Sequence, residues 1–96
     1  MDPNKTMMQN GINYPNDLDP FLVNILDKAR SGERKIKITY EKGQEQIGYI
    51  VASMTSPRKF PMVSPRSDGG SGNLLGAKIF QVSDANCNRV LWRNGN

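Results

Sequence analysis

The sequence predicts a small α+β domain, mostly β, in which an N-terminal helix packs on a strongly bent barrel of four or five strands. Three observations predict it: residues 17–32 read as a capped amphipathic helix, residues 34–53 alternate like two strands, and short strand-like segments follow. A chain of 96 residues is long enough for one domain. Such a sheet protects its edges best by curling into a barrel, and the helix would cover one open end.

The first 16 residues are predicted to be a flexible tail. They are rich in Asn and Met, contain Pro3 and Pro15, and show neither a helical nor a strand period. A segment of this kind buries too little apolar surface to fold alone. We therefore expect the folded domain to occupy residues 17–96.

The helix is predicted from its ends as much as from its period. Asp19 is placed to cap the N-terminus, and Pro20 fits the first helical position, where a missing N–H costs nothing. Leu18 and Val23 occupy the two ends of a hydrophobic staple, and Gly32 suits the stop. The face expected to pack on the sheet consists of Phe21, Leu22, Ile25, Leu26 and Ala29.

Two strands are predicted next, joined by a turn at Lys42-Gly43. In the first strand, residues 34–41, apolar and polar side chains alternate: Ile36, Ile38 and Tyr40 face one way, and Lys35, Lys37 and Thr39 the other. The second strand, residues 45–53, is fairly apolar on both faces, so we expect it to be central. Gly48 allows this strand to bend sharply, as at the corner of a small barrel.

The middle of the chain breaks the strand pattern. Three prolines interrupt it: Pro57, Pro61 and Pro65. We expect a flexible loop over residues 55–73, with at most a short edge strand at residues 59–64. Two further strands are predicted at residues 75–83 and 89–93.

The charge is unevenly spread along the chain. Residues 1–33 hold three basic and five acidic residues, a net charge of −2, whereas residues 34–96 hold ten and four, a net charge of +6. A basic β part attracts phosphates, acidic proteins or anionic membrane surfaces. A solvated surface with a lysine excess is the alternative.

The composition also bears on location. No apolar run approaches the roughly 18 residues of a membrane span, and residues 1–17 lack the apolar stretch of a secretory signal. The single Cys87 has no second cysteine for an internal disulfide, which suits a reducing compartment. We expect a cytoplasmic protein without a membrane partner.

Most catalytic chemistries lack their usual residues. The chain has no histidine, so the usual general base near neutral pH is missing, and Cys87 has no partner for Cys–His catalysis or a Cys-rich zinc site. The carboxylates do not cluster in the sequence. We therefore expect no enzyme, no catalytic residue, no metal site and no cofactor.

The candidate binding residues are cations and one aromatic side chain. Two similar tripeptides, Ser56-Pro57-Arg58 and Ser64-Pro65-Arg66, lie eight residues apart with Lys59 and Phe60 between them. Such a segment can contact phosphates and stack a base, although a proline-braced loop with solvated charges fits the pattern as well. Cations on the outer face of the strands extend this surface. The predicted binding set is Lys35, Lys37, Arg58, Lys59, Phe60, Arg66 and Lys78.

One block of the chain resembles a known family. It consists of Asp19-Pro20-Phe21-Leu22, the helix that follows, the stretch Ile38-Thr39-Tyr40-Glu41-Lys42-Gly43, and Gly48-Tyr49-Ile50. It resembles the opening of the Hfq family of bacterial Sm-like RNA chaperones, which also begins with an Asp-Pro-Phe-Leu helix and keeps glycines at the turn and in strand two. The resemblance covers about a third of the chain and implies an SH3/Sm-like barrel.

The chain also departs from that family. Gln46 stands where the family keeps an apolar residue, and the Tyr-Lys-His element of the second Sm motif has no counterpart. The family's uridine pocket therefore does not carry over, and the only candidates that the resemblance leaves are Lys28 and Arg30, on the helix that bears the family's basic rim. A looser likeness is to WYL-type domains, which share the order of elements but not, here, the Trp-Tyr-Leu signature.

Two functions are consistent with these observations. The first is a non-enzymatic nucleic-acid-binding or regulatory module that uses the basic β surface and the Pro/Arg loop. The second is a protein-interaction module, such as an adaptor, an inhibitor of viral or other origin, or an assembly subunit, that binds through the loop or an edge strand. The last strand, residues 89–93, is the expected seam, for a protein partner or for a homo-oligomer.

Overall fold

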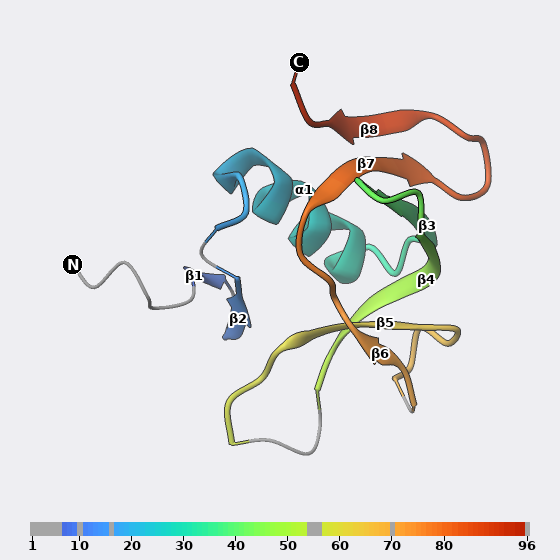
Figure 1. Cartoon of the computed structure of the whole chain (residues 1–96). Coiled ribbons are helices and arrows are strands. Elements are labelled where there is room, and N and C mark those ends of the chain that lie inside the picture. Colours follow the sequence, from blue (N-terminus) through green and yellow to red (C-terminus); the bar gives the residue numbers. More distant parts are fainter. Residues whose placement is uncertain (1–6, 10, 16, 54–56, 70, 96) are drawn as a thin grey trace.

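The computed structural model describes residues 7–9, 11–15, 17–53, 57–69 and 71–95. Within them the chain forms a small α+β fold made mostly of strands (Figure 1). A hairpin of β1 (Met7–Gln9) and β2 (Ile12–Tyr14) precedes α1 (Pro20–Ser31). The main sheet contains β3 (Ile36–Tyr40), β4 (Glu45–Ala52), β5 (Pro61–Ser64), β6 (Asn73–Leu74), β7 (Ile79–Asp84) and β8 (Val90–Arg93).

The main sheet is antiparallel and open. Its six strands follow the order β6-β5-β4-β3-β7-β8, so β6 and β8 are its edges. Within the described residues no pairing joins β6 to β8, and a closed barrel is therefore not confirmed. The predicted strands over residues 34–41, 45–53 and 89–93 are confirmed as β3, the central β4 and β8.

Two predictions after β4 agree with the structure only in part. In the segment 55–73, expected to be a flexible loop with at most an edge strand at residues 59–64, a strand does form, β5, but it lies between β4 and β6 rather than at an edge. Its first residue, Pro61, needs no ladder N–H because it opens the strand. The strand predicted over residues 75–83 begins four residues late: β7 starts at Ile79, and β6 ends at Leu74, before the predicted range. Lys78 interrupts the extended backbone with a φ of 62°.

The strand β4 serves both halves of the sheet, and Gly48 lies where it changes partner. Gly48 stands opposite Ile36 of β3, whereas the next residue, Tyr49, stands opposite Ser64 of β5. A Cβ atom at position 48 would lie 2.3 Å from the Ser64 carbonyl oxygen. Only glycine permits this approach of the two backbones, which agrees with the bend predicted at this residue.

The helix begins as predicted but presents a different face to the sheet. The Asp19 carboxylate accepts a hydrogen bond of 2.9 Å from the Phe21 N–H, which confirms the N-cap. Phe21, expected in the core, is 76% exposed. The side chains that α1 buries are Leu22, Val23, Leu26, Asp27 and Ala29. Because Val23 and Asp27 turn inward, the buried stripe is rotated away from Phe21.

The structure differs from the flexible tail predicted over residues 1–16. Residues 12–14 form β2, and Ile12 and Tyr14 are almost completely buried. Asn13 ties the strand to the domain, because its N–H donates to the Lys59 carbonyl oxygen at 2.7 Å. Three residues are too few to show a strand period, so the sequence carried no signal for this strand.

A buried polar cluster joins this N-terminal hairpin to the helix. The Tyr14 hydroxyl donates to Asp27 Oδ1 at 3.1 Å, and Arg30 Nε donates to the same oxygen at 2.9 Å. Asp27 is only 3% exposed, and a buried carboxylate is costly unless it is paired. Burial raises the pKa of Tyr14, and the negative charge of Asp27 raises it further. The phenol therefore stays protonated and acts as a donor.

The approach of β4 to β5 predicts a large effect for Gly48→Ala. The added Cβ would overlap a backbone oxygen, so the free energy of unfolding should fall by about 3 kcal/mol, the upper end of the cost of overpacking. Urea denaturation measures it. The matched control is Ile47→Thr, a change at a neighbouring side chain that is 53% exposed, which should cost about 0.5 kcal/mol or less. Equal effects of the two variants would contradict the bend.

The polar cluster predicts an effect for Tyr14→Phe that depends on pH. At pH 7 the variant should lose about 1–3 kcal/mol, because Asp27 loses a buried donor. Above pH 10 the unfolded wild type releases the phenol proton while the folded state keeps it. The free energy of unfolding of the wild type should therefore fall as pH rises above 10, and this phenol accounts for up to about 1.4 kcal/mol per pH unit of the fall. The variant lacks the phenol, so its free energy of unfolding should fall less steeply.

Urea denaturation between pH 7 and pH 11 tests this difference. Tyr49→Phe, in a half-buried tyrosine of β4, is the control for loss of a hydroxyl. The prediction fails if Tyr14→Phe and wild type lose stability in parallel above pH 10.

Candidate functional site

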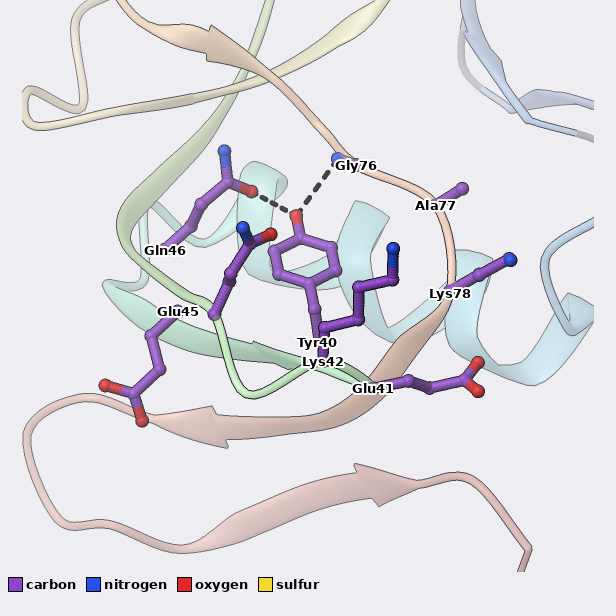
Figure 2. Close-up of a pocket in the computed structure, with 9 residues that line it drawn as sticks. Tyr40, Glu41, Lys42, Glu45, Gln46, Gly76, Ala77 and Lys78 are labelled. Carbon is purple, nitrogen blue, oxygen red and sulfur yellow. Dashed lines mark hydrogen bonds between the residues drawn. The ribbon is translucent and has the colours of Figure 1, made fainter.

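A hollow of about 580 Å³ lies at the end of β3, where the β3–β4 turn meets the segment before β7 (Figure 2). Its lining is polar and comes from two stretches of chain: Tyr40, Glu41, Lys42, Gln44, Glu45, Gln46, Gly76, Ala77 and Lys78. Residues 76–78 belong to the part of the predicted strand 75–83 that forms no strand in the structure. The irregular backbone there forms one wall of the hollow.

Tyr40 braces the two walls of this hollow. Its hydroxyl donates to Gln46 Oε1 and accepts a hydrogen bond of 3.0 Å from the Gly76 N–H (Figure 2). A Cβ atom at position 76 would lie 2.9 Å from the Tyr40 ring, so glycine is needed for this contact. Burial raises the pKa of Tyr40, and the phenol is therefore neutral at physiological pH. It serves as a structural brace rather than as a base.

The charged groups of the hollow are two lysines and two glutamates. Glu45 points away from Tyr40 in Figure 2, and its carboxylate lies 3.8 Å from Lys37 Nζ. Lys78 is held by its backbone, whose carbonyl oxygen accepts from the Glu41 N–H at 3.0 Å. With Glu45 directed toward Lys37, the charged side chains left in the lining are Lys42, Lys78 and Glu41, which together carry a net charge of +1. Two ammonium groups beside polar side chains suit an anionic group such as a phosphate or a carboxylate.

The structure distributes the seven predicted binding residues over separate places. Lys35 and Lys37 lie on or next to β3, and both are half-buried. Arg58 and Lys59 are exposed in the segment before β5, and Phe60 beside them is half-buried. Arg66 follows β5, and Lys78 lines the Tyr40 hollow. Along the chain β5 lies between Arg58 and Arg66, the cations of the two Ser-Pro-Arg tripeptides; Ser64 is its last residue, and Ser56 lies outside the described residues.

Two members of this set already have partners. Arg66 forms a bidentate pair with Asp68, with distances of 3.0 and 2.7 Å, and the pair holds the pKa of the Asp68 carboxyl below its usual value. Lys37 faces Glu45, as described above. Exposed pairs of this kind reduce the positive charge offered to a ligand. The set therefore does not form one continuous cationic patch.

Sequence reasoning missed an apolar surface between the helix and the edge strand. It consists of Phe21, Ile25, Val90, Leu91 and Trp92, which we call the α1–β8 face. Phe21 is 76% exposed and Val90 44%, while the other three are half-buried. Two hollows of about 340 and 330 Å³ lie along this face. Exposed apolar side chains beside an open strand are typical of an interaction surface.

The signal for this face was present in the sequence but ambiguous. A helical stripe that starts at Phe21 and one that starts at Leu22 differ by a rotation of about 100° around the axis. The burial of Tyr14 against Asp27 favours the second stripe, because it turns Asp27 inward. The contact between Tyr14 and Asp27 joins distant residues, so the helical period of residues 20–31 alone does not predict it.

Metal and membrane sites were also sought among the described residues. No group of three or more His, Cys, Asp or Glu side chains there could hold a metal ion. No helix in this part of the chain is long and apolar enough to cross a membrane. Cys87 is exposed in the turn before β8.

Comparison with known proteins gave no match to a family model, a curated protein or a solved structure. The resemblances to Hfq and to WYL-type domains therefore stay predictions. The function of the chain has to be argued from its own surfaces.

Proposed function

We propose that this protein is a non-enzymatic protein-interaction module that binds its partner through the α1–β8 face. The observation that supports the proposal is Phe21, a large apolar side chain that is 76% exposed beside an open edge strand. Burying a phenylalanine side chain against a partner contributes roughly 1.5–3 kcal/mol of binding free energy. The unbound domain lacks this contribution. Val90, 44% exposed on the strand itself, extends the same surface.

The edge strand β8 adds backbone groups to this surface. The Asn94 N–H donates inward to the Phe80 carbonyl oxygen at 2.8 Å, and Trp92 stands opposite Val82 of β7. Inward and outward groups alternate along an antiparallel strand, so the N–H and C=O of Arg93 face the open edge. A partner segment can pair with these groups by strand addition.

Two further expectations from the sequence are consistent with this proposal: the fold family and the compartment. The bent β4 and the short connections are compatible with an SH3/Sm-like barrel, which we retain as a proposal for the fold family. An exposed thiol at Cys87 suits a reducing compartment such as the cytoplasm. An adaptor, an inhibitor or an assembly subunit would each use a surface of this kind.

The proposal predicts that Phe21→Ser weakens capture of the partner while Phe80→Ser does not. Both phenylalanines are exposed, Phe80 at 42%, but Phe80 lies on β7 outside the α1–β8 face. Affinity capture from nuclease-treated extract, with bound proteins quantified by mass spectrometry, should show at least a tenfold loss for Phe21→Ser alone. A protein retained equally by both variants would contradict binding through this face.

Nucleic-acid binding is the second candidate, favoured by the lysines of the Tyr40 hollow and by the net charge of +6 on residues 34–96. Fluorescence anisotropy with a labelled single-stranded oligonucleotide should then show affinity that falls steeply between 50 and 200 mM salt. The double variant Lys42→Gln with Lys78→Gln should reduce the salt slope, and Arg93→Gln on β8, outside the Tyr40 hollow, should leave it nearly unchanged. Binding that is absent at low salt removes this candidate.

A further inference from the structure

We infer that the partner segment received by the α1–β8 face is short, extended and acidic, and that it adds to the sheet along β8. This inference rests on the proposed function and specifies the chemistry of the partner. Three features support it: the charges at the two ends of β8, the poor fit of a second copy, and the geometry of the strand.

The charge around β8 is positive. Arg89 and Arg93 flank the apolar part of the strand, and residues 85–95 contain no Asp or Glu. Lys28 and Arg34 line the hollow at the C-terminal end of the helix. An acidic segment therefore meets opposite charge at both ends of the strand.

Two acidic groups near this face are already engaged. Asp84 accepts hydrogen bonds from the N–H groups of Asn86, at 2.8 Å, and Cys87, at 3.3 Å, and lies 3.3 Å from Arg34 Nη1. These backbone donors, together with the nearby arginine, hold the pKa of the Asp84 carboxyl below its usual value. Asp19 at the other end of α1 caps the helix. Arg89 and Arg93 are exposed, and Arg93 Nε donates to the neutral Gln81 Oε1 at 2.9 Å, a contact that leaves its positive charge in place.

A second copy of the chain fits this edge poorly. Antiparallel pairing of β8 with itself over its whole length, with Val90 of one copy opposite Arg93 of the other, brings Arg89 of each copy within one position of the other copy's Arg93. Like charges opposite one another destabilise a strand pair. The same arginines that attract an acidic segment therefore disfavour self-association.

The geometry of β8 limits the length of the segment. Trp92 stands opposite Val82 and Val90 opposite Ser83, so Leu91 is an extra residue that forms a bulge. A bulge interrupts regular pairing, which leaves only a short run for strand addition. Side-chain contacts must then supply much of the affinity. Because of the bulge, Arg89 lies level with Asp84 and Arg93 with Gln81, three ladder positions apart, so the two arginines lie on opposite faces of the strand. The segment that fits has acidic residues on either side of an apolar side chain that covers Val90 and Phe21.

The probe for this inference is an eight-residue peptide that alternates glutamate and valine, with an otherwise identical lysine–valine peptide as the control. Amide resonances of the isotope-labelled full chain are followed by NMR during titration of each peptide. The glutamate peptide should shift the resonances of β8 and of the first turn of α1, with affinity that falls as salt rises. The lysine peptide should bind at least tenfold more weakly.

Charge reversal at both arginines, Arg89→Glu with Arg93→Glu, should reverse the preference of the protein, so that it binds the lysine peptide more tightly than the glutamate peptide. Ser67→Glu, in the exposed turn after β5 and outside both the α1–β8 face and the Tyr40 hollow, is the control for added negative charge and should change neither affinity by more than about twofold. Circular dichroism establishes that each variant is folded.

Equal affinity for both peptides, or shifts at the Tyr40 hollow instead of β8, would overturn the inference. Absence of binding by either peptide would overturn it as well, because β8 would then be a protected edge. A dimer in light scattering that is lost on charge reversal would identify a second copy as the occupant. In each case the Phe21→Ser and Phe80→Ser comparison still decides separately whether the α1–β8 face binds a protein.

Discussion

The arrangement of this domain depends on the buried carboxylate of Asp27. One of its oxygens accepts hydrogen bonds from Tyr14 and Arg30, at 3.1 and 2.9 Å, and so connects the N-terminal hairpin to the helix. A carboxylate that is 3% exposed is tolerable only while these partners remain in place. The cluster therefore sets both the position of the hairpin and the rotation of α1 about its axis.

The rotation of α1 decides which side chains remain at the surface. With Asp27 inward, Leu22, Val23, Leu26 and Ala29 enter the core, and Phe21 is left beside the edge strand. A polar contact on one side of the helix thus produces an apolar surface on another side. Because β8 is an edge of an open sheet, that surface combines side chains with unpaired backbone. The interaction proposal follows from this combination rather than from any motif.

The cations show why a net charge does not define a binding site. Arg66 pairs with Asp68, Lys37 faces Glu45, and β5 lies between Arg58 and Arg66 along the chain. The other cations include the lysines of the Tyr40 hollow, which suits an anionic group, the exposed Arg58 and Lys59 before β5, and the arginines at the two ends of β8. Each location has its own geometry, so the two proposed ligands, a nucleic acid and an acidic protein segment, predict different binding residues.

The local elements of this protein can be predicted from short stretches of its sequence. Asp19 and Pro20 specify the start of the helix, alternation specifies β3, and Gly48 marks the bend of β4, because capping, period and close backbone approach act over a few residues. The burial of Ile12 and Tyr14, the exposure of Phe21, the internal position of β5 and the open sheet became visible only in the folded chain. These features depend on contacts between residues distant in the chain, such as Tyr14 with Asp27, whose free energy no local pattern records.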